Sequence, residues 1–164
     1  MRARIALSHG GCLSGVKLDA NRILVPVNGD KASEHIFRWA CQLARQSKAH
    51  VHAVYVIEVP LDMPMESEIA EATDRGEEIL ARMEAIGAEE KVKDVHAMSL
   101  RARHAGPAIV MEAEDRQMDA VILGVPYRRR FGSCTLGTTA SYIFNNAPCQ
   151  VIFWRERAPS PVLA

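Results

Sequence analysis

The fold is decided by one stretch, Val121-Ile-Leu-Gly124-Val-Pro-Tyr-Arg-Arg-Arg-Phe-Gly-Ser-Cys-Thr-Leu-Gly137-Thr138-Thr139-Ala-Ser-Tyr142. Its first residues are apolar and largely β-branched, and glycine and proline follow them, which is typical of a short strand buried on both faces. Gly137 permits a backbone conformation that a Cβ would forbid. The hydroxyl of Thr138 or Thr139 can then cap the next helix. Because a helix N-terminus presents free N–H groups and a partial positive charge, the stretch predicts an anion site, with phosphate as the obvious ligand.

Short apolar segments alternate with amphipathic segments along the rest of the chain. We expect strands at 22–28, 51–59, 91–100, 119–123 and 150–154, and helices at 32–47, 66–89, from 106 onward and at 137–146. Asp30 or Ser33 is the expected cap of the first helix. Alternating strands and helices favour a parallel sheet that is covered by helices on both faces.

Composition limits the class of protein. A chain of 164 residues with 48% hydrophobic residues is expected to form one domain. We expect a flexible leader or linker at 1–20, the domain at 21–155 and a tail at 156–164. The formal net charge is zero, which argues against general nucleic-acid binding. The cysteines lack CxxC spacing, which is typical of reduced thiols in a cytoplasmic protein.

The glycine spacing resembles the signature of the universal stress protein family, Gly-x2-Gly-x9-Gly followed by Ser or Thr. Gly124 and Gly137-Thr138 match it at the right separation, and Ala147-Pro-Cys-Gln-Val-Ile152 resembles the entry to the family's last strand. The resemblance covers about 22–154. It implies a Rossmann-like fold of the adenine nucleotide alpha-hydrolase-like type, with a five-stranded parallel sheet in the order 3-2-1-4-5 and helices on both faces. Ligands of such sheets bind where the winding direction reverses, here between strands 1 and 4.

The resemblance also implies a binding site for ATP or AMP, with or without Mg²⁺. The positions that correspond to the family's nucleotide-binding residues are Pro26, Asn28, Val56, Gly124, Tyr127, Gly137, Thr138 and Thr139. Two positions depart from the pattern. Asn28 replaces an aspartate, which keeps a hydrogen-bond acceptor but loses the charge. Tyr127 replaces a glycine, which adds a bulky ring where backbone amides would approach a phosphate.

Arg128, Arg129 and Arg130 follow Tyr127 directly. Guanidinium groups form bidentate, charge-assisted bonds with phosphate, so an arginine clamp can replace the glycine cradle. The alternative is a solvated loop, or one that pairs with the acidic helix expected at 66–90.

Two functions follow from the resemblance. The first is a nucleotide-binding sensor or regulatory module in stress response. The second is a protein-interaction module that no longer binds nucleotide and regulates a membrane amino-acid transporter, because Val125-Pro-Tyr-Arg-Arg-Arg-Phe-Gly132 also resembles stress-protein domains attached to amino-acid permeases. An enzyme is not expected, since P-loop, GxSxG and HExxH motifs are absent from the sequence. His50 and His52 share a strand face, but the sequence shows no third metal ligand at a convincing spacing.

The last expected strand is apolar and is placed at the edge of the sheet. In the family that this chain resembles, the final strands of two subunits pair antiparallel across a twofold axis. We therefore expect a homodimer, with Val151, Phe153 and Trp154 near the interface. The alternative is that the charged segment Arg155-Glu-Arg157 covers the edge strand of a monomer.

Overall fold

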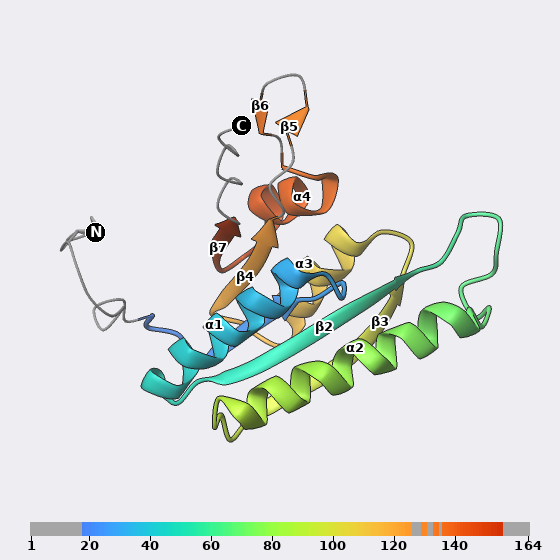
Figure 1. Cartoon of the computed structure of the whole chain (residues 1–164). Helices are drawn as coiled ribbons and strands as arrows, with labels where there is room; N and C mark the ends of the chain where they lie inside the picture. Colours follow the sequence, from blue (N-terminus) through green and yellow to red (C-terminus); the bar gives the residue numbers. More distant parts are fainter. Residues whose placement is uncertain (1–17, 126–128, 131–132, 135, 156–164) are drawn as a thin grey trace, which may run out of the picture.

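The computed structural model describes residues 18–125, 129–130, 133–134 and 136–155 (Figure 1). Tyr127 and Arg128 lie outside these residues, as does the expected tail. The elements in chain order are β1 (Arg22–Pro26), α1 (Lys31–Ser47), β2 (His50–Glu58), α2 (Ala70–Glu89), β3 (Val95–Ala102), α3 (Ala105–Asp115), β4 (Ala120–Val125), β5 (Arg129–Arg130), β6 (Ser133–Cys134), α4 (Thr138–Asn146) and β7 (Gln150–Arg155).

The main sheet has five strands in the order β3-β2-β1-β4-β7, and each neighbouring pair is parallel. This arrangement confirms the predicted order 3-2-1-4-5. β1 lies at the centre, and Ile23, Leu24 and Val25 are fully buried. A separate two-stranded antiparallel ladder joins β5 and β6 within the loop after β4, and the sequence analysis did not predict it.

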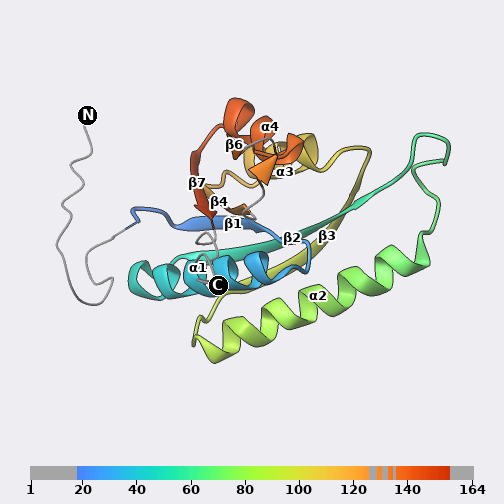
Figure 2. The same ribbon diagram turned by 45° about the horizontal axis from the view of Figure 1, so that its top comes forward.

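Helices cover both faces of the main sheet (Figures 1 and 2). On one face, the apolar sides of α1 and α2 form a cluster that includes Phe37 and Met83. On the other face, α3 and α4 contribute Ile109 and Ile143 to a second cluster. Buried strands therefore carry apolar residues on both sides, which is why β1 and β4 read as continuous apolar runs.

Two elements begin later than the sequence predicted. α2 begins at Ala70 rather than near 66, because the preceding segment folds as turns and its carbonyl groups accept hydrogen bonds from arginine side chains at the end of β3. Ile69 is the N-cap of α2 and supplies no side-chain hydrogen bond, so no capping residue in the sequence marks the start. β3 begins at Val95 rather than 91.

The end of the leader expected at 1–20 packs against the domain. Ala20 is buried and Leu18 packs against the first core cluster, although both fall within the segment 1–20 that we expected to be flexible. The division into leader, domain and tail stays a prediction.

β7 lies at one edge of the main sheet and pairs with β4, as expected. Val151 and Phe153 pack against the cluster under α3 and α4, whereas Trp154 packs against the cluster under α1. All three side chains are half-buried.

Candidate functional site

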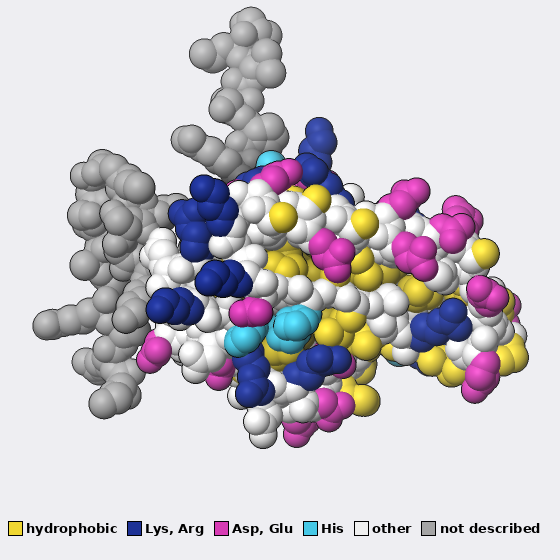
Figure 3. All heavy atoms as spheres, turned by 90° about the horizontal axis from the view of Figure 1, so that it is seen from below, with side chains coloured by type: hydrophobic (Ala, Val, Ile, Leu, Met, Phe, Trp, Pro, Cys, Tyr) yellow, Lys and Arg dark blue, Asp and Glu magenta, His cyan; other side chains and the backbone are white. Residues whose placement is uncertain are grey.

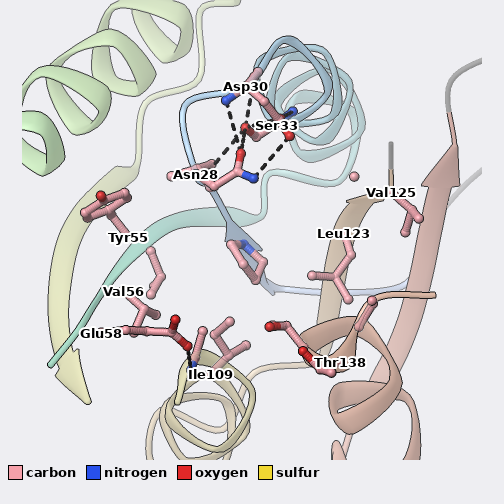
Figure 4. A pocket seen from close by; sticks show the side chains of 18 of the residues that line it. Asn28, Asp30, Ser33, Tyr55, Val56, Glu58, Ile109, Leu123, Val125 and Thr138 are labelled. Carbon is pink, nitrogen blue, oxygen red and sulfur yellow. Dashed lines mark hydrogen bonds between the residues drawn. The ribbon is translucent and has the colours of Figure 1, made fainter. Parts of the chain in front are cut away.

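A cleft of about 1000 Å³ opens at the carboxyl edge of the sheet, where β1, β2 and β4 end and where α3 and α4 begin. This is the position at which parallel α/β sheets bind ligands. The lining residues are Pro26, Val27, Asn28, Asp30, Ser33, Val54, Tyr55, Val56, Glu58, Arg75, Ala105, Ile109, Leu123, Gly124, Val125, Leu136, Gly137, Thr138, Thr139 and Ala140. Figure 4 shows polar groups at the end of β1 and apolar side chains from β2, α3 and β4 around the cavity.

The end of β1 is closed by a compact hydrogen-bond network (Figure 4). Asn28 Oδ1 accepts from the N–H of Asp30 at 3.1 Å and from Ser33 Oγ at 2.8 Å. Asn28 Nδ2 donates to Asp30 Oδ2 at 3.1 Å. Asp30 Oδ1 accepts from the N–H of Ser33 at 2.6 Å, which makes Asp30 the N-cap of α1. Gly29 sits in the turn with φ of 81°, a conformation that favours glycine.

This network changes the role expected for Asn28. The side-chain oxygen that the sequence suggested as an acceptor for ligand already accepts a hydrogen bond from the N–H of Asp30, and the Ser33 hydroxyl, 2.8 Å away, shares its single proton between this oxygen and Asp30 Oδ1 at 2.7 Å. Asp30, two residues later, carries the negative charge that Asn28 lacks, and it also lines the cleft. Asn28 therefore fixes the turn, while Asp30 supplies the carboxylate at this wall.

The N-terminus of α3 is already occupied by an anionic side chain. Glu58, at the end of β2, accepts a hydrogen bond from the N–H of Ala105 at 2.7 Å. The N-cap residue, His104, makes no side-chain capping bond. Glu58 thus satisfies one of the free N–H groups at this helix end and places a negative charge at its positive pole.

The N-terminus of α4 is different, since no side chain of the described residues caps it. Gly137 is its N-cap, so the prediction that Thr138 or Thr139 caps the helix is wrong. Gly137 has φ of −66°, which any residue adopts, so the predicted need for a special backbone conformation is also wrong. A Cβ at Gly137 would meet no described atom within 4 Å, so none of the described residues fills the space in front of the helix.

Gly124 has a packing role at the end of β4. A Cβ added there would come within 3.1 Å of the Ala32 carbonyl oxygen and 3.2 Å of the Ile36 side chain. Glycine therefore lets β4 approach α1 closely at the rim of the cleft.

The predicted site residues fall into two groups. Those that line the cleft are Pro26, Asn28, Val56, Gly124, Gly137, Thr138 and Thr139. Tyr127 and Arg128 lie outside the described residues. Arg129 and Arg130 form β5 by their backbone, and their side chains also lie outside what the structure describes, so the arginine clamp stays a prediction.

Sequence reasoning did not find the contributions of Tyr55, Glu58, Arg75 and Ile109 to the cleft. The sequence predicted only that Glu58 and Tyr55 lie near the end of a strand and that Arg75 lies in a charged helix. Asp30 and Ser33 were identified as helix caps, and their position directly after β1 was the available signal that they line the site.

A histidine cluster lies outside the cleft, at the amino ends of β2 and β3. His52 is buried and its ring stacks on His96 with centroids 4.8 Å apart, and His50 stands 6.4 Å from His96. Burial, and then the neighbouring His96 and Arg116, lower the pKa of His52 to about 4. Figure 3 shows histidine side chains grouped on one face among basic and acidic ones.

His96 is the third imidazole that the sequence could not place beside His50 and His52. The rings are stacked, which does not direct their nitrogen atoms toward a common point. Among the described residues, no group of three or more His, Cys, Asp or Glu side chains could hold a metal ion. Within the same residues, no helix has the length and apolar character needed to cross a membrane.

Comparisons with known proteins agree with this architecture. A sequence model of the universal stress protein family matches residues 20–155. Universal stress protein MJ0531 of Methanocaldococcus jannaschii is 28% identical over 137 residues, which span 80% of this chain and 79% of that protein. The fold is similar to a universal stress protein of Archaeoglobus fulgidus in complex with dAMP, with a TM-score of 0.64, 20% identity and coverage of 80% of this chain and 95% of that one. It is also similar to an Arabidopsis thaliana universal stress protein family protein, At3g01520, with AMP bound, with a TM-score of 0.63, 18% identity and coverage of 86% and 97%.

Proposed function

The chain belongs to the universal stress protein family, and on this premise we propose that it binds an adenine nucleotide, AMP or ATP, in the cleft and acts as a regulatory module rather than an enzyme. Relatives of the same fold that hold dAMP and AMP support the choice of an adenine nucleotide. The cleft volume of about 1000 Å³ lies at the upper end of the range for small-molecule sites.

The observation that carries the proposal is the contrast between the two helix N-termini at the cleft. The carboxylate of Glu58 occupies the start of α3, whereas none of the described side chains caps α4 or fills the space before Gly137. Free N–H groups and the helix dipole favour an anion at α4. We therefore place the phosphate at Gly137, Thr138 and Thr139.

The remaining walls suit the rest of a nucleotide. Val56, Ile109 and Leu123 provide apolar surface for the base, and Pro26 adds to it at the end of β1. Asp30 places a carboxylate on the wall of the cleft, and a carboxylate can accept hydrogen bonds from ribose hydroxyl groups. Apolar walls beside a few convergent polar groups are typical of small-molecule sites.

Calorimetric titration with AMP and with ATP, each with and without Mg²⁺, tests this function. Micromolar binding of either nucleotide supports it. Absence of binding up to millimolar nucleotide would contradict it and would favour the interaction module that regulates a membrane transporter.

Substitutions at Gly137 test the placement of the phosphate. An aspartate there adopts the existing backbone conformation, caps α4 and places a negative charge where we put the phosphate. Gly137→Asp should therefore raise the melting temperature and abolish nucleotide binding. Gly137→Asn is the matched control, since it caps the helix without the charge and should retain more of the affinity. Equal affinity of the two variants for nucleotide would contradict a phosphate position at this helix end.

We further propose a cytoplasmic homodimer that serves in a stress response, in keeping with the family. The edge strand β7 supports the dimer, because Val151, Phe153 and Trp154 are half-buried at an edge that an antiparallel partner strand would cover. Light scattering coupled to size-exclusion chromatography measures the oligomeric state directly, and a monomer at tens of micromolar would contradict the dimer.

A further inference from the structure

The wall of the cleft that α2 provides has no role in the function proposed so far. Arg75 lies on α2 and lines the cleft beside Tyr55 and Val56 of β2. It makes no ion pair or hydrogen bond with the other described residues. Two other arginines on these helices, Arg38 of α1 and Arg82 of α2, form ion pairs with glutamates. Arg75 is therefore a guanidinium at the rim of the site whose donors are available.

Gly76, the next residue, fixes the position of this wall. A Cβ on Gly76 would come within 2.7 Å of Cδ1 and 3.0 Å of Cε1 of Tyr55. The absence of a Cβ lets the ring of Tyr55 pack directly against the backbone of α2. This contact explains why the helix keeps an interior glycine, a residue that is otherwise unfavourable there, and it ties the segment that carries Arg75 to the end of β2.

The location of this wall relative to α4 indicates what it faces. In Figure 4, Tyr55 lies near α2 on one side of the cleft and Thr138 lies on the opposite side. β1 separates β2 from β4 in the sheet, so the two sides are about 10 Å apart at the strand level. If the phosphate binds at α4 and the base packs on Val56 of β2, the base lies beside the wall of the cleft that carries Arg75.

We propose that Arg75 is a ligand-contact residue that donates a hydrogen bond to N7 or N1 of the bound purine, with the Tyr55–Gly76 contact holding α2 in place. The inference rests on the proposed nucleotide function. An arginine fork is suited to this contact because it remains protonated and its donors lie in one plane. The acceptors of adenine that a protein side chain can reach at the edges of the base are ring nitrogens such as N7 and N1.

The test is a cycle between protein and ligand, measured by calorimetry. The ligands are AMP, 7-deaza-AMP and 1-deaza-AMP, and the proteins are wild type, Arg75→Gln and the control Arg82→Gln. Arg82 lies on the same helix but is not among the residues that line the cleft, and it pairs with Glu34 and Glu89. Because Arg75 is exposed, its replacement should leave the melting temperature unchanged.

The expected result is that Arg75→Gln binds AMP about tenfold more weakly than wild type, as for the loss of a hydrogen bond to a charged group. One deaza analogue should bind wild type about tenfold more weakly than AMP, and this difference should vanish in Arg75→Gln but persist in Arg82→Gln. If wild type binds AMP and Arg75→Gln binds it equally tightly, the role of Arg75 is refuted while the proposed nucleotide function stands. A loss in Arg75→Gln with unchanged discrimination against both analogues would overturn the base contact. Wild type that binds none of the three ligands would overturn the nucleotide function, and this inference with it.

Discussion

Acidification should destabilise this fold through one buried imidazole, that of His52. Its side chain is 8% exposed, and its Nδ1 has no hydrogen-bond partner among the described residues. The ring stacks on His96, and Arg22 and Arg116 add positive charge around it. Burial is the main cause that lowers the pKa of His52 to about 4.

The direction of the effect follows from the two states of the chain. In the unfolded chain the imidazole titrates near its usual value of about 6.5. Between the two pKa values the unfolded state binds a proton that the folded state excludes, so the free energy of unfolding falls as the pH falls from about 6.5 to about 4. For these pKa values the loss between pH 7 and pH 5 is about 2 kcal/mol. That is a large part of the stability of a typical domain of this size.

Urea unfolding at pH 7, 6 and 5 measures this loss. His52→Leu removes both the titrating group and an unpartnered buried nitrogen, so its stability should depend on pH less than that of wild type by about 2 kcal/mol over this range. His104→Gln is the matched control, because His104 is exposed and lies outside the cluster. If His52→Leu loses as much stability as wild type between pH 7 and pH 5, the assignment of the pH dependence to His52 is refuted.

Three further predictions concern packing and reactivity. Gly76→Ala should destabilise the protein by about 1 kcal/mol, despite the better helix propensity of alanine, because the new Cβ would clash with the ring of Tyr55. In a Tyr55→Ala background the same change should stabilise the protein by about 1 kcal/mol. A double-mutant cycle in urea unfolding measures the coupling between the two residues, and additive effects would disprove the contact. Asn28→Asp should cost about 1–2 kcal/mol in urea unfolding, because it replaces the amide donor 3.1 Å from Asp30 Oδ2 with a second carboxylate; a stability equal to wild type would show that the network is dispensable. Burial raises the pKa of Cys41 to about 12, so this thiol should resist alkylation at pH 8 until the protein unfolds, and peptide mapping of rapid labelling in the folded protein would contradict this.

The sequence predicted the helices and strands well because the patterns that indicate them are local in the chain. Apolar runs bounded by glycine or proline marked β1 and β4, and the spacing of Ile36, Ala40 and Leu43 marked the buried face of α1. The strand order came from the family resemblance alone, since periodicity carries no information on which strands are neighbours. The start of α2 was missed because Ile69 provides no capping group that a sequence could show.

The site was predicted less completely, for a physical reason. Residues at the ends of β1 and β4 and at the start of α4 follow from topology, because carboxyl ends of parallel strands meet at one edge. Glu58 and Arg75 depend on where α3 and α2 lie in three dimensions, and no spacing along the chain encodes those positions. Gly137 was found, but for the wrong reason: its backbone angles are ordinary, and its contribution is the open space before α4.

The contrast between the helix starts limits how a ligand can be oriented in the cleft. A phosphate at α3 would have to displace the carboxylate of Glu58 from the N–H of Ala105 and would leave that carboxylate beside another anion. A phosphate at α4 displaces no side chain of the described residues. The difference favours one orientation, with the phosphate at α4 and the base toward β2 and α2. In the proposed complex, Glu58 would therefore exclude the reverse orientation of the nucleotide. Glu58→Gln keeps a hydrogen-bond acceptor for the N–H of Ala105 but removes the charge, so it should weaken this preference for one orientation.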